Sequence, residues 1–314
     1  MSSKTFNELI NEINEHLTND RDRGTAFEKM VVAYLKNEPI YKKKYSDVWM
    51  LSDVPTNLGI SRIDTGVDIV AKDFNGQLTA VQAKFYKGKV GKDAINSFVA
   101  ETGKDCYSAG IIVSTTDEWN KNAESTLKNT SKPFSIIGLT QLKNSSVDWS
   151  KFSFSEDNDL SIKKPKKLRG YQEEAIKNAV EYFKSNEDYH DRGKLIMAPG
   201  TGKTFTSLKI TEALMKDQVK SKFNVLYLVP SIQLLSQTLF NWNDDVSEDI
   251  HMTSFSVVSD RKATKKGKES EDDLSSKDIG FPATTDVNEL INNYEYVKEL
   301  DTGREMTVVF STYQ

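Results

Sequence analysis

The chain has 314 residues, 37% of them hydrophobic and 28% charged, a composition typical of a globular protein with room for two domains. No apolar run is long enough to span a membrane, and the polar N-terminus is unlike a secretory signal. One cysteine excludes a disulfide framework, and with three scattered histidines it also excludes a cysteine- or histidine-based metal cluster. From these absences we expect a cytoplasmic protein. The formal net charge of −4 gives no overall sign of nucleic-acid binding.

The first 150 residues have the pattern of a compact α/β domain. Apolar residues at helical spacing predict helices over residues 6–17 and 25–35, the second with a capping box between Thr25 and Glu28. Asn75-Gly76 predicts a hairpin turn. Further helices are predicted near residues 95–102 and 119–127, and short strands over residues 48–51, 67–71, 78–85, 109–114 and 134–139.

A polar stretch, residues 151–167, separates this domain from a second one, residues 168–314. Pro165 among like charges favours a linker, and a strip that contacts DNA is the alternative. In the second domain helical patterns alternate with short apolar runs. Helices are predicted over residues 171–183, 232–240 and 287–300, strands over residues 195–197, 225–229 and 307–310, and an exposed charged insertion over residues 259–280.

The second domain contains a phosphate-binding loop with the sequence APGTGKT, placed between the first predicted strand and a helical pattern. Gly200 and Gly202, on either side of Thr201, allow the backbone amides to surround a polyphosphate, and the positive end of the next helix faces the anion. Lys203 is predicted to reach the β- and γ-phosphates of ATP, and the Thr204 hydroxyl is predicted to ligate Mg²⁺.

In the first domain, polar side chains gather on one face of the predicted hairpin. On the first strand, Asp68 points away from the core face. On the next strand side chains alternate between the two faces, so Gln82 and Lys84 both point away from the core. This set suits metal-assisted hydrolysis of a phosphodiester. Asp68, with the Gln82 amide oxygen or the Ala83 backbone carbonyl, would hold Mg²⁺. Lys84 would orient or deprotonate the attacking water or stabilise the phosphorane, and Glu28 is a candidate second carboxylate.

Taken alone, each of these residues has a structural explanation, because Asp68 can cap a turn and Lys84 can lie on an exposed face. Taken together, the order helix-Glu, Gly-Val-Asp, hairpin, Gln-x-Lys resembles the Mrr-like branch of the PD-(D/E)xK nucleases over about residues 20–140. Gln82 stands where the wider superfamily has an acid, a substitution that this branch shares. Asp64 is the main rival of Asp68 for the metal, and the Gly-Val-Asp context favours Asp68.

A local basic patch overlaps these residues. Lys84, Lys87, Lys89 and Lys92 place four cations in nine residues without an acid. Because local patches matter more for nucleic-acid binding than the summed charge, the acidic net charge is only weak evidence against DNA as a partner.

Three segments of the second domain resemble motifs of superfamily-two helicases. Arg169, Tyr171 and Gln172 lie ahead of the phosphate loop and resemble the adenine-reading motif, which implies that they stack on and hydrogen-bond to the base of ATP. Residues 228–237 resemble motif Ia, and residues 310–314 resemble the next motif that contacts DNA.

The Asp-Glu-x-His box of these motors does not follow the phosphate loop in the 314 residues. Asp117-Glu118-Trp119 looks like such a box, but it precedes Lys203, against the order of the family. We interpret it as the capped start of a helix. The chain is therefore expected to be the N-terminal part of a longer polypeptide.

A Mrr-like nuclease ahead of a superfamily-two motor resembles the single-polypeptide restriction-modification enzymes called Type ISP, whose nuclease the run SRIDTGVDIVAKD closely resembles. The resemblance implies an α/β fold, with a restriction-endonuclease-like mixed sheet flanked by helices and then a partial RecA-like parallel α/β domain. It also implies Mg²⁺ and ATP as cofactors, and a nuclease coupled to a translocase that moves on double-stranded DNA.

The rest of the motor, a methyltransferase that uses S-adenosylmethionine and a target-recognition domain are expected in the same longer polypeptide. Two alternatives remain at this point. The chain could be the restriction subunit of a Type I system, which has the same order of domains. It could also be a nucleotide-gated DNA-binding module with an inactive nuclease.

Overall fold

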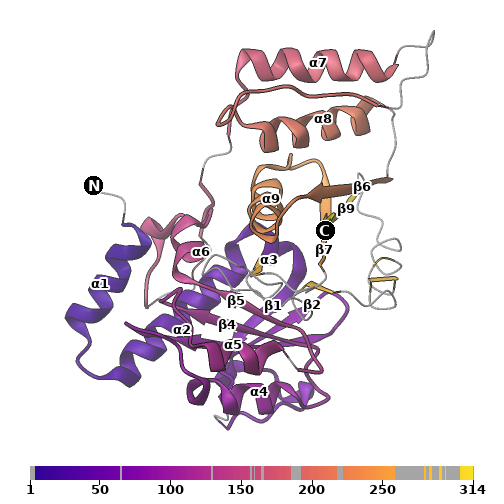
Figure 1. Cartoon of the computed structure of the whole chain (residues 1–314). Helices are drawn as coiled ribbons and strands as arrows, with labels where there is room; N and C mark the ends of the chain where they lie inside the picture. The colour runs from indigo at the N-terminus through magenta and orange to yellow at the C-terminus, as the bar shows by residue number, and fades with distance from the viewer. Residues whose placement is uncertain are drawn as a thin grey trace. The chain divides into compact units, whose positions relative to one another are not determined.

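The computed structural model describes residues 4–63, 66–128, 130–155, 158, 160–163, 166–184, 192–217, 222–258, 279–280, 283–284, 290–291, 294 and 305–313. The chain divides into two compact units. The first unit is Met1–Lys163 with Val258–Glu289, and the second unit is Lys164–Val257 with Leu290–Gln314. Figure 1 labels their elements. The insertion predicted over residues 259–280 and the helix predicted over residues 287–300 lie almost entirely outside the described residues.

The first unit is built on a mixed sheet with the strand order β1-β2-β3-β4-β5. Its strands are β1 (Tyr45–Met50), β2 (Ile69–Asp73), β3 (Leu78–Lys84), β4 (Ala109–Ser114) and β5 (Phe134–Ile137). The pairs β1–β2 and β2–β3 are antiparallel, whereas β3–β4 and β4–β5 are parallel. The mixed sheet that the sequence predicts is confirmed.

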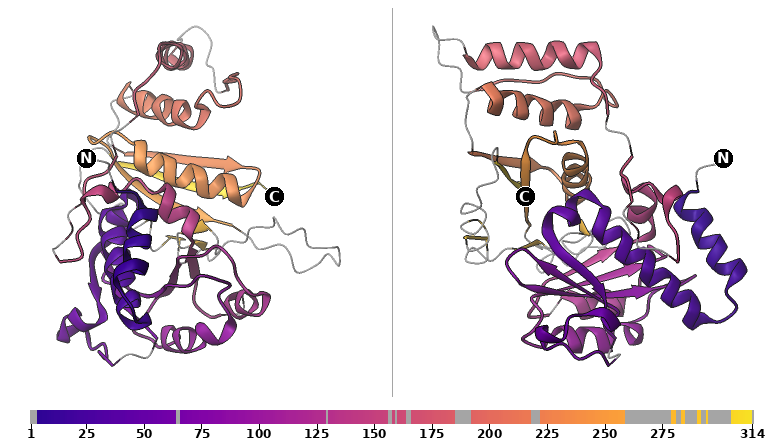
Figure 2. Two further views of the ribbon diagram at one scale, coloured as in Figure 1. Left: turned by 90° about the vertical axis from the view of Figure 1, so that its left-hand side faces the viewer. Right: turned by 180° about the vertical axis from the view of Figure 1, so that it is seen from behind.

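Helices cover both faces of this sheet. They are α1 (Phe6–His16), α2 (Asp20–Asn37), α3 (Pro39–Lys44), α4 (Asn96–Thr102), α5 (Lys121–Lys128) and α6 (Leu139–Asn144). On one face, side chains of α4 and α5 such as Phe98 and Leu127 join Val70 and Ala80 in one buried cluster. α2 packs along β1 and β3 on the other face. Figure 2 shows α1 and α2 in indigo.

The predicted start of the second helix is wrong. Thr25 lies inside α2, and the N-cap is Asn19, whose side-chain oxygen accepts a hydrogen bond from the backbone N–H of Asp22 at 2.7 Å. An asparagine is as good a cap as a threonine, and one helical glycine, Gly24, is not enough to end the helix. Glu28 is therefore a mid-helix residue and not part of a capping box.

Much of the stretch predicted as a linker packs on the first unit. The backbone N–H of Lys163 donates to the Ser146 carbonyl at 2.7 Å, and that of Leu160 donates to Asn37 Oδ1 at 3.0 Å. Leu160 and Phe152 are buried. The chain therefore folds back along this unit as far as residue 163, and the boundaries predicted for the two domains stay a prediction.

The second unit contains three parallel strands in the order β6-β9-β7, which are β6 (Lys222–Val229), β7 (His251–Val257) and β9 (Glu305–Thr312). Its helices are α7 (Gly170–Lys184), α8 (Lys203–Asp217) and α9 (Ile232–Asp245). Trp242 is 1% exposed and packs against Tyr227 and Phe310, with ring centroids 4.9 Å and 5.7 Å away. The predicted parallel α/β arrangement is confirmed. A two-residue strand, β8 (Ala283–Thr284), belongs by its residues to the first unit.

The strand predicted over residues 195–197 is wrong. These residues form no strand, and Ile196 is 90% exposed. A short apolar run becomes a strand only when a neighbouring strand pairs with it, and no described strand does so here. Conversely, β7 is a strand that the sequence does not predict, because polar side chains alternate irregularly with its apolar ones. Both an apolar residue, Met252, and a polar one, Ser256, are buried in it.

Among the helices that the structure describes, none combines the length and the apolar character that crossing a membrane requires.

Candidate functional sites

Asp68 lies directly before β2 and opposite Gln82 on β3. Its backbone N–H donates to the Val81 carbonyl at 3.0 Å, so the antiparallel ladder continues through it. Its Oδ2 accepts a hydrogen bond from the backbone N–H of Ala83 at 2.8 Å. The half-buried carboxylate is thus held against the strand that carries the other predicted site residues.

Gln82 is only 2% exposed. The sequence predicts that this side of β3 is open to solvent, so its burial was not expected. Its Nε2 donates to the Gly66 carbonyl at 2.6 Å, and this bond sets the orientation of the amide. Its Oε1 is buried and has no hydrogen-bond partner among the described residues. A buried polar atom without a partner costs about 1–3 kcal/mol, so this oxygen fits a ligand that is added to the protein.

Gly66 is required by the packing around this site. Its φ is +101°, and a Cβ there would lie 2.8 Å from Ser97 Oγ and 2.9 Å from the backbone nitrogen of Phe98. The start of α4 therefore leaves room for glycine alone at this position, and the Gly66 carbonyl is set where Gln82 can reach it.

Lys84 is the last residue of β3 and follows the side-chain alternation of Gln82. The backbone carbonyl of Lys84 accepts a hydrogen bond from the Thr115 N–H at 3.1 Å. Asp68, Gln82, Ala83 and Lys84 are thus brought together at one end of the hairpin. A carboxylate, an amide oxygen, a backbone carbonyl and an ammonium group at one end suit a hard cation and an anionic substrate.

Glu28 belongs to the helix that covers the other face of the sheet. It lies on α2, and the ring of its neighbour Phe27 contacts Phe85 with centroids 5.9 Å apart. By strand alternation Phe85 leaves β3 on the opposite face from Gln82 and Lys84. α2 therefore approaches the same end of β3, but from the face that Asp68 and Gln82 do not occupy. The rival Asp64 lies outside the described residues.

In the part of the chain that the structure describes, no group of three His, Cys, Asp or Glu side chains could hold a metal ion. A site at Asp68 would depend on one aspartate with neutral oxygens, those of Gln82 and of the Ala83 backbone. Such a donor set is typical of Mg²⁺, which keeps several waters and takes few protein ligands.

The phosphate loop of the second unit ends at the start of α8. Gly200 and Gly202 have φ values of +76° and +86°, a conformation that favours glycine. α8 begins at Lys203, which is exposed, and the N–H groups of a first helical turn have no partner within the helix. This geometry fits a polyphosphate at the helix N-terminus, as the sequence predicts.

The residues predicted to read adenine are attached to this loop. The Tyr171 hydroxyl accepts from Arg169 Nη1 at 3.1 Å and donates to the Thr201 carbonyl at 3.0 Å. The Gln172 amide is buried, and its Nε2 donates to the Thr201 carbonyl at 3.3 Å and to Thr206 Oγ1 at 3.1 Å. Its Oε1 accepts from the backbone N–H of Arg169 at 3.0 Å. In this state the Gln172 amide holds the loop, and Tyr171 remains 43% exposed.

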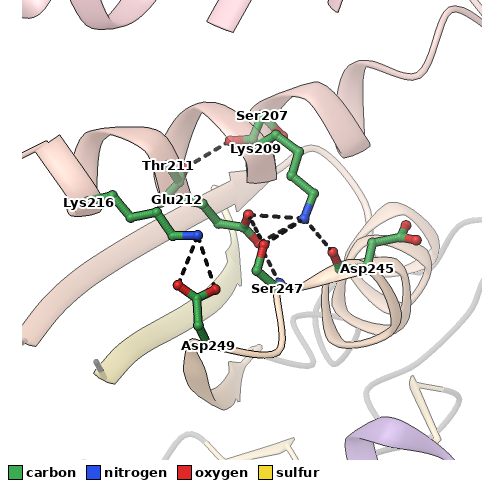
Figure 3. A network of polar contacts seen from close by, with 8 residues as sticks. All are labelled: Ser207, Lys209, Thr211, Glu212, Lys216, Asp245, Ser247 and Asp249. Carbon is green, nitrogen blue, oxygen red and sulfur yellow. Dashed lines mark hydrogen bonds and ion pairs between the residues drawn. The ribbon is translucent and has the colours of Figure 1, made fainter. Parts of the chain in front are cut away.

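A polar network connects α8 to the end of α9 (Figure 3). Lys209 Nζ lies 3.0 Å from Glu212 Oε2 and donates to the Asp245 carbonyl at 2.7 Å. Glu212 accepts from the backbone N–H and the hydroxyl of Ser247 at 2.9 Å and 2.7 Å. Both Lys209 and Glu212 are largely buried, so each needs the other to offset its lost hydration.

A second connection between the same helices lies beside the phosphate loop. Trp242 Nε1 on α9 donates to the backbone carbonyl of Thr204 at 3.1 Å. Thr204 is the residue predicted to ligate Mg²⁺. No sequence pattern indicates this contact, because Trp242 is far from the loop along the chain and looks like an ordinary core residue.

The two segments that resemble DNA-contacting motifs end side by side. Val229 pairs with Thr312, and the backbone N–H of Tyr313 donates to the Val229 carbonyl at 3.3 Å. Ser231 then caps α9 by accepting from the Leu234 N–H at 3.3 Å. Gln314 lies outside the described residues.

Asp117 caps a helix, but not the helix that the sequence predicts. Its carboxylate accepts from the backbone N–H of Thr140 at 3.2 Å and from the Thr140 hydroxyl at 2.7 Å, so it caps the first turn of α6. Two donors on one carboxylate agree with a structural role and not with an acidic box for ATP hydrolysis.

Two protein families match the chain. Residues 36–159 match the family described as "Restriction endonuclease", and residues 165–314 match the family described as "Type III restriction enzyme, res subunit". The first range includes Asp68, Gln82 and Lys84 and begins after Glu28. A comparison with curated proteins finds no match.

Among solved structures, the chain is similar to the "ATP-dependent Type ISP restriction-modification enzyme LlaBIII bound to DNA", with 52% identity and a TM-score of 0.83 over 99% of this chain. The chain spans 18% of the length of that relative. It is also similar to a nuclease-deletion mutant of the Type ISP enzyme LlaGI in complex with a DNA substrate mimic. That likeness has 55% identity and a TM-score of 0.37, and it covers 48% of this chain and 13% of the other.

Proposed function

Because the chain has the restriction endonuclease domain and the helicase-like domain found in Type ISP restriction-modification enzymes, we propose that it is the cleaving and ATP-binding part of an ATP-dependent restriction endonuclease. Its substrate is double-stranded DNA. The nuclease uses Mg²⁺, and the motor uses ATP to translocate along the duplex. In this proposal the rest of the motor, the methyltransferase and the target-recognition domain belong to the same longer polypeptide.

In the proposed nuclease site, Asp68 and Gln82 hold the metal ion with a carboxylate oxygen and Oε1. The Ala83 carbonyl is the further donor. When bound, Mg²⁺ polarises the scissile phosphate and lowers the pKa of a water. As an ammonium group Lys84 orients the attacking water and stabilises the phosphorane; only as a neutral amine would it instead accept the proton of that water. Glu28, which lies on α2, is the candidate second carboxylate and has a smaller part than Asp68.

In the proposed nucleotide site, the loop from Gly200 to Gly202 surrounds the phosphates with backbone N–H groups. Lys203 neutralises the β- and γ-phosphates, and the Thr204 hydroxyl ligates the Mg²⁺ of the nucleotide. Arg169 and Tyr171 bind the base. Gln172 joins them when its amide leaves the Thr201 carbonyl, which it contacts in this structure.

The buried Gln82 Oε1 without a hydrogen-bond partner among the described residues, next to an aspartate held by the Ala83 N–H, is the observation that carries the nuclease proposal. The purified chain should nick supercoiled plasmid DNA in Mg²⁺ and stop when EDTA is added. If a folded chain leaves the plasmid intact over a full Mg²⁺ titration, the alternative of a DNA-binding module with an inactive nuclease replaces this proposal.

We also propose a cytoplasmic location, because DNA and ATP, the substrates proposed above, are intracellular. The other alternative, a restriction subunit of a Type I system, has no observation in its favour beyond the shared order of domains. The likeness that covers 99% of this chain at 52% identity is to a Type ISP enzyme.

A further inference from the structure

The loop that leaves the proposed catalytic strand carries the unexplained basic patch. β3 ends at Lys84, and residues 85–91 connect it to a short 3-10 helix, Lys92–Ala94. The ammonium groups of Lys87, Lys89 and Lys92 are exposed, and none has an ion pair or hydrogen bond to another described residue. A Cβ placed on either glycine of this loop would meet no atom within 4 Å, so the loop surface is open to a partner.

The loop is fixed at its start by one side chain of the neighbouring strand end. Thr115, which follows β4, donates its backbone N–H to the Lys84 carbonyl at 3.1 Å. Its hydroxyl accepts from the Tyr86 N–H at 2.8 Å and donates to the Tyr86 carbonyl at 2.8 Å. Thr115 is 8% exposed, so these bonds are shielded from water and hold Tyr86 beside the strand.

The other end of the loop is fixed as well. The Val90 N–H donates to the Glu118 carbonyl at 2.9 Å, and the Asn120 N–H donates to the Val90 carbonyl at 2.9 Å. Val90 is fully buried. The lysines between these anchors therefore project from a defined backbone and not from a free tail.

The position of the loop limits what it can touch. Lys87 is three residues beyond Lys84, so their Cα atoms are at most about 10 Å apart. One strand of DNA has a phosphate about every 3.4 Å along the helix axis, so this distance covers about three nucleotides. The acids beside the loop, Asp93 and Glu118, form no ion pair with these lysines in the described part of the chain.

We propose that residues 86–92 bind the backbone phosphates that flank the scissile phosphate, with Lys87 and Lys89 as the main contacts. The loop thereby positions the strand to be cut against Asp68, Gln82 and Lys84. Thr115 is a positioning residue that acts through the loop backbone. This inference rests on the proposed nuclease function and adds to it the surface that holds the substrate.

The first test measures the salt dependence of DNA binding. The 314-residue chain binds a short fluorescent duplex in Ca²⁺, which replaces Mg²⁺ so that no cleavage occurs, and the Kd is measured over a KCl series. The Lys87→Gln/Lys89→Gln variant should weaken binding on the order of tenfold. It should also make the negative slope of log affinity against log salt shallower by about 1.8, since each phosphate contact contributes about −0.9 to that slope.

The matched control is Lys36→Gln/Lys42→Gln, which removes the same charge from exposed residues beside Tyr45 and Phe74, at the other end of the hairpin. It should keep most of the wild-type slope. If both double variants have the same slope, the lysines act only through net charge and the inference is wrong. If the wild-type chain neither binds nor cuts DNA, the proposed function fails as well, so the two failures are distinguishable.

A second variant separates positioning from charge. Thr115→Val removes the hydroxyl at nearly constant shape and leaves every lysine in place, so it should slow plasmid nicking while keeping the wild-type salt slope. Thr115→Ser keeps the hydroxyl and should restore the nicking rate. Equal nicking rates in the valine, serine and wild-type chains would remove Thr115 from the inference.

Discussion

At the scale of single residues, Lys84 is expected to be essential for cleavage and dispensable for folding. Lys84→Met keeps the length of the side chain and removes its charge, so nicking in Mg²⁺ should fall by at least about 100-fold. Lys72→Met is the control, because Lys72 lies on β2 at the turn end of the same hairpin. Equal rates for the two variants would show that the ammonium group of Lys84 takes no part in the chemistry.

Glu28 is expected to matter much less. α2 covers the face of the sheet opposite to Gln82, so Glu28→Gln should lower the nicking rate by less than about tenfold. The capping role that the sequence suggests is excluded, since Asn19 caps this helix. A loss as large as that of Lys84→Met would mean that the Glu28 carboxylate reaches the metal after all.

Gly66 has a steric role that unfolding can measure. Gly66→Ala forces a Cβ against the backbone of Phe98 at a positive φ, so the free energy of unfolding should fall by about 2–4 kcal/mol. Gly59→Ala is the matched control, because Gly59 also has a positive φ but an added methyl group there would meet no atom within 4 Å. It should cost only about 1–2 kcal/mol, the strain of the left-handed backbone. Denaturant titration that gives equal values would contradict the packing of α4 on Gly66.

At the scale of elements, α8 and α9 are expected to respond to nucleotide as one body. Trp242→Phe removes the hydrogen bond to the Thr204 carbonyl and keeps an aromatic ring in the core. Loss of a partly buried hydrogen bond, about 1 kcal/mol, should weaken Mg-ATP binding by about 3–10-fold.

The control for this variant is Tyr227→Phe. Tyr227 packs on the same indole ring, but its hydroxyl has no hydrogen bond among the described residues, so the affinity for Mg-ATP should be unchanged. Calorimetry or fluorescent-nucleotide titration gives both values. An unchanged affinity in Trp242→Phe would show that α9 does not shape the phosphate loop.

The elements that the sequence predicts well are those whose signal is local. β4 is an uninterrupted apolar run and forms over the predicted residues, and Asn75-Gly76 forms the predicted turn between β2 and β3. The strand predicted at residues 195–197 and the unpredicted β7 depend instead on which strands pair with them, and that information lies far away in the chain.

The same distinction holds for the sites. The turn and the period of two are enough to bring Asp68, Gln82 and Lys84 to one end of the hairpin. The burial of Gln82 could not be predicted, because its amide contacts Gly66, which in turn lies against the start of α4, far along the chain. The two hydrogen bonds from the Gln172 amide to Thr201 and Thr206 could not be predicted either, because they depend on how α7 packs on α8.

At the scale of the whole molecule, the chain is expected to bind ATP without turning it over. It has the phosphate loop, but no Asp-Glu-x-His box follows that loop in these 314 residues, and Asp117 is occupied as a helix cap. Lys203→Ala should abolish nucleotide binding, because Lys203 supplies the mobile cation at the phosphates. Phosphate release by the wild-type chain that rises with DNA would show that another acidic residue performs the role of the box.

The central claim is that a metal ion at Asp68 and Gln82 cuts DNA, and Asp68→Asn tests it most directly. Asparagine keeps an oxygen that can accept from the Ala83 N–H, so the hairpin should still form. It removes the carboxylate charge that binds Mg²⁺, so nicking of supercoiled plasmid should fall by more than about 100-fold at every Mg²⁺ concentration. A folded Asp68→Asn chain that nicks plasmid at the wild-type rate would contradict the claim.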